Sequence, residues 1–179
     1  GWLKSHDPEL DESHRPVKVD PREGYLASAN EANGAWTAYS EPPYRHQRLS
    51  ELLGGEGVLH PDDLLRISYD ELDAMARRLA PVWQPLLPND QQARALCSWA
   101  VRQGARQDAE GRAHLAAFHK LHRHVTYALL EDRLGVTTAQ RLLGDSSAIL
   151  GFQARLDSLL ALEEPGTLDR PALARLLTR

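Results

Sequence analysis

Helical periodicity dominates this chain from about residue 46 to its end. Apolar side chains recur there at intervals of three and four residues, which places them on one face of an α-helix. Proline and glycine stand where helices begin or end, as at Pro61 and Gly135. The pattern predicts a helical bundle. Its expected helices cover residues 48–53, 61–83, 90–104, 108–134, 137–143, 146–162 and 168–178.

Residues 1–45 have a different texture. Prolines are frequent there, and because proline lacks a backbone donor and fixes φ, long helices are not expected. One stretch, residues 24–30, reads as a short strand that ends at Asn30 in a turn rich in Asn and Gly. The sequence therefore predicts a mainly α protein with two regions. An irregular segment with one strand spans 1–45, and an α-helical domain spans 46–179.

Composition excludes several classes of function. The net charge is −4, whereas binding to a phosphate backbone needs a cationic surplus, so no nucleic-acid partner is expected. No apolar run approaches the ~18 residues that a membrane helix needs, so no membrane partner is expected either. Cys97 is the single cysteine, which rules out a disulfide framework within the chain. Its place on a helical apolar stripe favours a buried core role over a reactive one.

Histidines and adjacent acids offer few candidates for chemistry. His119 and His122 are three residues apart on an expected helix, but no carboxylate lies within one turn of them. A half-exposed polar face is the favoured interpretation of these histidines, and metal binding is the alternative. Asp62/Asp63 and Glu163/Glu164 are adjacent pairs, which suit helix starts better than acid–base catalysis. No metal and no cofactor are predicted.

Asn30 and Arg48 form the most informative pair. A side-chain amide at the end of a strand can donate hydrogen bonds to a developing oxyanion. An arginine that opens a nearby helix can hold that amide or supply positive charge. From the residues alone, a plain turn role for Asn30 is the alternative.

Several motifs together resemble the penicillin acylase (penicillin amidase) family of N-terminal-nucleophile hydrolases. Order, spacing and residue types agree over about residues 20–87, and less specifically at Leu96–Trp99 and Phe118–Leu121. The motifs are residues 25–31 (YLASANE), 42–53 (PPYRHQRLSELL) and 60–70 (HPDDLLRISYD).

The resemblance implies an internal segment of the β chain of an amidohydrolase. Members are cut from a precursor, and the new N-terminal serine of the β chain attacks an amide while its own amino group serves as the base. By position, Asn30 would contribute to the oxyanion hole, and Arg48 would orient the Asn30 side chain. The serine is expected upstream of Gly1, so this chain alone is expected to show no catalysis. Some members place a calcium-binding acid between the asparagine and the arginine. A calcium site is not expected here, because after Glu31 the only carboxylate between Asn30 and Arg48 is Glu41.

The same resemblance sets the expected surroundings. The helices would be the helical insert of an αββα fold whose sandwich is mostly absent here. The partners would be the α chain and the rest of the β chain, with an acylated small molecule of the β-lactam or acyl-homoserine-lactone type as substrate. Members of the family are commonly periplasmic or secreted, and act in antibiotic biosynthesis or quorum quenching. The alternative is a stand-alone helical module that binds another protein.

Overall fold

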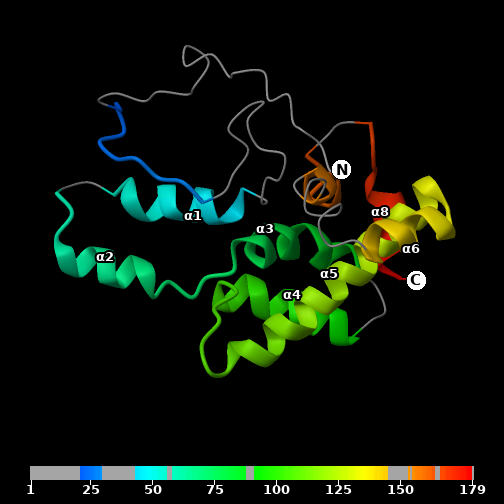
Figure 1. Ribbon diagram of the computed structural model, residues 1–179. Helices are drawn as coiled ribbons and strands as arrows, with labels where there is room; N and C mark the ends of the chain where they lie inside the picture. Colours follow the sequence, from blue (N-terminus) through cyan, green and yellow to red (C-terminus); the bar gives the residue numbers. More distant parts are fainter. Residues whose placement is uncertain are drawn as a thin grey trace, which may run out of the picture.

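The computed structural model describes residues 21–29, 43–55, 58–87, 91–144, 153, 155–163 and 166–178. These residues are mainly α-helical, and the only β pairing among them is an isolated antiparallel bridge between Leu72 and Arg106. The mainly α prediction is confirmed. Figure 1 shows α1 and α2 set apart from a body that contains α3, α4, α5, α6 and α8. The elements are α1 (Tyr44–Leu53), α2 (Pro61–Ser68), α3 (Ala74–Trp83), the 3-10 turn η3 (Gln84–Leu86), α4 (Gln91–Gln103), α5 (Gly111–Leu134), α6 (Val136–Gly144) and α8 (Arg170–Leu177).

The core lies between α3, α4, α5 and α8. Trp83 at the end of α3 is fully buried, stacks on Phe118 of α5 with ring centroids 5.6 Å apart, and donates its indole N–H to the carbonyl oxygen of Leu160 at 3.0 Å. Cys97 is also buried, and this burial raises the pKa of its thiol to about 12. A thiol in that state stays protonated near neutral pH, so the predicted core role of Cys97 is confirmed.

The helix predicted over 61–83 is two helices. The chain leaves the helical path after Ser68, and the amide of Asp73 donates to the carbonyl oxygen of Ala105 at 2.9 Å. The Asp73 carboxylate then accepts from the amide of Ala76 at 2.7 Å and so caps the start of α3. The prediction of one helix was wrong because backbone pairing with the α4–α5 connection and an aspartate cap prevailed over continuous apolar spacing.

Other helix ends follow local chemistry closely. Gly135, with φ of +79°, separates α5 from α6, which begins at Val136. Asp169 caps α8 by accepting from the amide of Ala172 at 2.7 Å, and Pro171 occupies the first turn. A left-handed residue suits glycine, which explains why α5 stops there.

The segment 21–29 lies beside α1. The hydroxyl of Tyr25 donates to the carbonyl oxygen of Ser50 at 3.3 Å, and Ala29 is buried. Figure 1 shows this segment, in blue, running to α1. The described residues of the predicted strand, 24–29, have no strand partner, and an extended segment without one forms no ladder. Asn30, at the end of that prediction, lies outside the described residues, as do Glu41 and Glu164.

Gly111, the first residue of α5, is packed so closely against its neighbours that a substitution there tests how α4 and α5 pack. A Cβ atom there would lie 1.9 Å from the carbonyl oxygen of Arg106 and 3.0 Å from the Trp99 ring. We expect Gly111→Ala to lower the free energy of unfolding by about 1–3 kcal/mol, because the backbone must shift to admit the methyl group. Urea denaturation measures this. Gly144→Ala is the control, since no described residue has an atom within 4 Å of a Cβ there. Equal stability of the two variants would contradict the packing.

Candidate active-site cavity

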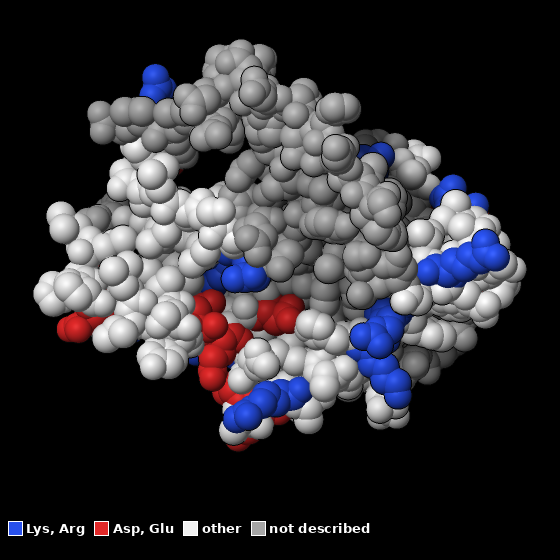
Figure 2. All heavy atoms as spheres, in the orientation of Figure 1, with Lys and Arg blue, Asp and Glu red and all other residues white. Residues whose placement is uncertain are grey.

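A cavity of about 500 Å³ lies beneath α1. Its wall is partly apolar, from Leu49, Leu52 and Met75, and partly charged. The charged and polar part comes from four places in the sequence: α1, the end of α2 with the break that follows it, the middle of α5, and Gln153 with Asp157. Figure 2 shows acidic and basic side chains side by side in the hollow below α1. The charged and polar lining residues are Tyr44, Arg45, Arg48, Ser68, Asp70, Asp73, His119, Gln153 and Asp157.

Arg48 is held in this wall by two carboxylates. Its Nε and Nη2 donate to the two oxygens of Asp70, each at 2.8 Å, and its Nη1 donates to Glu51 at 2.8 Å. These bonds hold the pKa of Asp70 below its usual value and raise that of Arg48. Such a bidentate pair fixes the plane of the guanidinium. Because guanidinium has five N–H groups, the contacts described here leave donors for a further acceptor.

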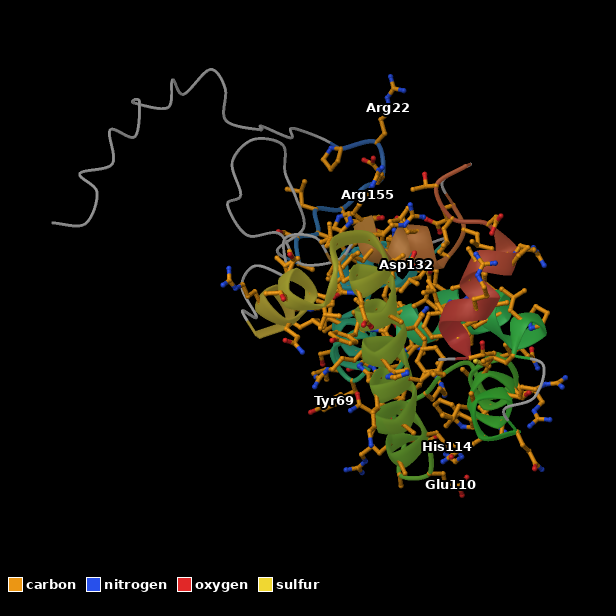
Figure 3. The ribbon with its side chains drawn as sticks, turned by 90° about the vertical axis from the view of Figure 1, so that its right-hand side faces the viewer. Arg22, Tyr69, Glu110, His114, Asp132 and Arg155 are labelled. Atoms are coloured by element: carbon orange, nitrogen blue, oxygen red, sulfur yellow. The ribbon has the colours of Figure 1, made fainter. Side chains whose placement is uncertain are left out.

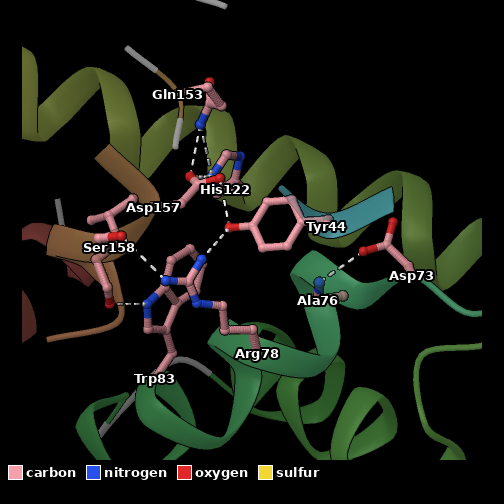
Figure 4. Close-up of polar contacts among 10 residues, drawn as sticks. Tyr44, Asp73, Ala76, Arg78, Trp83, His122, Gln153, Asp157 and Ser158 are labelled. Atoms are coloured by element: carbon pink, nitrogen blue, oxygen red, sulfur yellow. Dashed lines mark hydrogen bonds and ion pairs between the residues drawn. The ribbon is translucent and has the colours of Figure 1, made fainter. Parts of the chain in front are cut away.

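Tyr44 connects α1 to the buried part of the site (Figure 4). Its hydroxyl donates to Oδ2 of Asp157 at 2.7 Å, and the other oxygen of Asp157 contacts Nε2 of His122 and accepts from Nε2 of Gln153, both at 2.7 Å. Asp157 is fully buried. Burial, followed by the neighbouring Asp157 charge, raises the pKa of Tyr44, so the phenol stays protonated and acts as a donor.

Arg78 of α3 completes this network. Its Nη1 donates to the Tyr44 hydroxyl at 3.3 Å, its Nη2 donates to Ser158 Oγ at 3.2 Å, and its guanidinium pairs with Glu163. Arg78 therefore joins α1, α3 and the helical residues 155–160 through polar contacts. Since α1 has no buried residue, polar contacts hold it over the cavity. Those of Tyr44 and Arg48 are joined by an ion pair between Glu51 and Arg77 of α3 at 3.2 Å.

His119 and Asp73 form a second pair at the cavity wall. Nε2 of His119 lies 2.6 Å from Oδ2 of Asp73, and the His119 side chain is 53% exposed. The hydrogen bond to Asp73 raises the pKa of His119, against burial and the nearby Arg123 charge. Burial acts to raise the pKa of Asp73, but the bonds from His119 and from the Ala76 amide prevail and lower it.

The pair gives stability a defined pH dependence. The raised pKa of His119 means that its contribution is fully present below the unfolded value of about 6.5 and is lost as pH rises through the folded value. The lowered pKa of Asp73 has the opposite effect in acid: the contribution of Asp73 to stability is lost as pH falls through its folded pKa. We expect wild type to exceed His119→Gln by about 0.2–1 kcal/mol near pH 5.5, and the difference to vanish by about pH 9. Urea titration at several pH values measures this. His124→Gln is the matched control on the same helix, and a difference that grows with pH would contradict the pair.

The predicted histidine face is only partly right. His122 is 8% exposed and stacks on Trp83, so it does not belong to a half-exposed polar face. His119 and His122 contact different carboxylates, and the described ranges contain no group of three or more side chains that could hold a metal ion. The helix-start interpretation of Asp62/Asp63 is confirmed, because Asp63 accepts from the amide of His60 at 2.8 Å.

Comparison with known proteins gives the family. A family model described as penicillin amidase matches residues 1–176, which is nearly the whole chain. The chain belongs to the penicillin amidase family. No curated protein and no solved structure matches it. Within this penicillin amidase sequence, the roles of Asn30 and Arg48 stay predictions, since Asn30 lies outside the described residues.

Sequence reasoning missed most of the network around this penicillin amidase cavity. Tyr44 and Asp70 lie in the motifs that carry the family resemblance, so both could have been selected from the sequence as candidate site residues. Asp157 was not, because it lies 113 residues from Tyr44 and no motif joins them. In the part of the chain that the structure describes, no helix is both long and apolar enough to cross a membrane.

Proposed function

We propose that this chain belongs to an N-terminal-serine amidohydrolase that cleaves the amide bond of an acylated small molecule. The attacking serine would come from a part of the protein outside these 179 residues. The observation that carries the proposal is the match to the penicillin amidase family over residues 1–176. A β-lactam or an acyl-homoserine lactone is the proposed type of substrate.

The proposed chemistry divides between the serine and this chain. The serine oxygen forms a bond to the amide carbonyl carbon, and its α-amino group takes the proton through a water molecule. The negative charge that develops on the carbonyl oxygen is stabilised by the Asn30 amide, which Arg48 orients. The α-amino group then returns the proton to the amide nitrogen, and collapse of the intermediate breaks the C–N bond and releases the amine. Water hydrolyses the acyl ester that remains.

The cavity beneath α1 supports this assignment. Arg48 lies in its wall with its guanidinium plane fixed by Asp70, as an orienting residue requires. Leu49, Leu52 and Met75 give the same wall an apolar surface, which suits an aliphatic or aromatic acyl group. We therefore propose that α1 borders the bound substrate. The remaining partners would be the α chain and the rest of the β chain, in the periplasm or outside the cell.

Turnover of chromogenic amides tests the proposal. The complete precursor and the 179-residue chain are each assayed with phenylacetyl and fatty-acyl anilides. We expect turnover by the precursor and none by the chain alone, since the proposed nucleophilic serine would come from another part of the protein. The acyl group cleaved faster identifies the substrate class. An inactive, uncleaved precursor would favour the stand-alone binding module. Its surface would be the exposed Leu64 and Leu65 of α2 with Tyr69, which follows α2 and is labelled in Figure 3.

A further inference from the structure

A groove runs along the α4–α5 hairpin, away from the cavity beneath α1. It consists of two adjoining hollows that share Gln92, Leu96 and Ala117. One hollow extends toward Ala113 and His114 at the start of α5, and the other reaches Tyr127 and, on α6, Leu143. His114 marks the first end in Figure 3. At 1.5 Å per residue, the stretch of α5 from 113 to 127 is about 21 Å long, the length of about four helical turns.

The floor of this groove is apolar and narrow. Ala93, Ala95 and Ala117 leave little side chain above the helix backbones, so another helix can approach closely. Leu121, Tyr127 and Leu143 are partly buried side chains that pack against the core while still lining the groove. An amphipathic helix presents a matching stripe at i, i+3, i+4 and i+7.

The rim is basic although the chain as a whole is acidic. Lys120, Arg123 and His124 are exposed at the edge of the larger hollow, and no carboxylate lines either hollow among the described residues. None of the three has an ion pair within the described part of the chain. In Figure 2, basic side chains lie on the side of α5 and α6, while acidic ones gather below α1.

We propose that this groove binds an acidic amphipathic α-helix of a partner protein. Leucine-like side chains of that helix would fill the floor, and its carboxylates would face Lys120, Arg123 and His124. The length of the groove, the small residues of its floor and its cationic rim all favour an acidic amphipathic helix as the bound partner. The site lies on other residues than the amidohydrolase cavity, so the proposal stands independently of the proposed activity.

Fluorescence anisotropy with a synthetic helix tests the proposal. The probe is a labelled 15-residue peptide (about four turns) with leucine along one stripe and glutamate on the flanks. We expect saturable binding to the 179-residue chain. Replacing the glutamates by lysine should weaken binding at least tenfold, and scrambling the stripe should abolish it. Raising the salt concentration should weaken binding, because rim charges are screened.

Two pairs of variants locate the site. Lys120→Glu/Arg123→Glu should reverse the preference between the acidic and basic peptides, whereas Arg102→Glu/Arg175→Glu, exposed residues that line neither hollow, should leave it unchanged. Ala117→Trp should abolish binding by filling the floor, and Val101→Trp, elsewhere on α4, should not. Circular dichroism confirms that each variant is folded.

Two results would contradict the proposed site. Equal binding of both peptides would overturn the proposal. Preferential binding of phosphatidylglycerol vesicles at the same residues would also overturn it.

Discussion

Asp157→Ala is expected to lower the free energy of unfolding by about 3–5 kcal/mol, the largest loss of stability that we predict from this structure. The carboxylate is fully buried and is contacted by Tyr44, His122 and Gln153, each at 2.7 Å. Alanine would leave three polar groups without this acceptor. It would also cut the direct connection from α1 to the helical residues 155–160, so that only the contacts through Arg78 would remain. A buried polar group that loses its partner carries its full desolvation cost. For a domain with a total stability of about 5–15 kcal/mol, this loss is large.

Urea denaturation followed by tryptophan fluorescence measures this change, since Trp83, one of the four tryptophans, stacks on His122. Asp157→Asn keeps one acceptor oxygen and the shape of the side chain, so its loss should be smaller, about 1–3 kcal/mol. Asp62→Ala is the control for removal of an acid, because Asp62 is 84% exposed, and it should change stability by less than about 0.5 kcal/mol. If Asp157→Ala lowered the free energy of unfolding no more than Asp62→Ala does, the buried network would not hold α1.

The sequence predicted the helical body well because its signals are local. Apolar spacing gave α4, predicted over 90–104 and observed as Gln91–Gln103, and Gly135 ended α5 as predicted. The break between α2 and α3 was missed because it depends on pairing with residues 105–107, about 35 positions away. Apolar spacing continues through residues 69–73 whether the chain is helical or not, so periodicity alone cannot detect such a break.

The site was predictable only where a motif contained it. Arg48 was identified by resemblance, but its bidentate partner Asp70 was not, since pairing across 22 residues requires the turn between α1 and α2. His119 and His122 looked equivalent in the sequence. They are about 60° apart around the axis of α5, and this is enough to place one at the cavity wall beside Asp73 and the other in the core beside Asp157.

In the complete precursor, Asn30→Ala is expected to lower kcat by about 10²–10³, with a much smaller change in KM. An oxyanion-hole donor stabilises charge that is present only in the transition state, so its removal costs about 2.7–4 kcal/mol at that point of the reaction. Gln47→Ala is the matched control, since Gln47 is an exposed amide beside Arg48 that lines no part of the cavity. Turnover of the faster chromogenic amide gives both kinetic constants.

A double-mutant cycle shows whether Arg48 acts through Asn30. Arg48→Gln keeps a polar side chain but loses the bidentate bond to Asp70, and it should also lower kcat. If Arg48 orients the amide, the two losses are not additive, and Asn30→Ala/Arg48→Gln is scarcely slower than Asn30→Ala. Additive losses would mean that Arg48 acts on the substrate or on the fold by itself. A single variant Asn30→Ala with wild-type kcat would remove Asn30 from the mechanism.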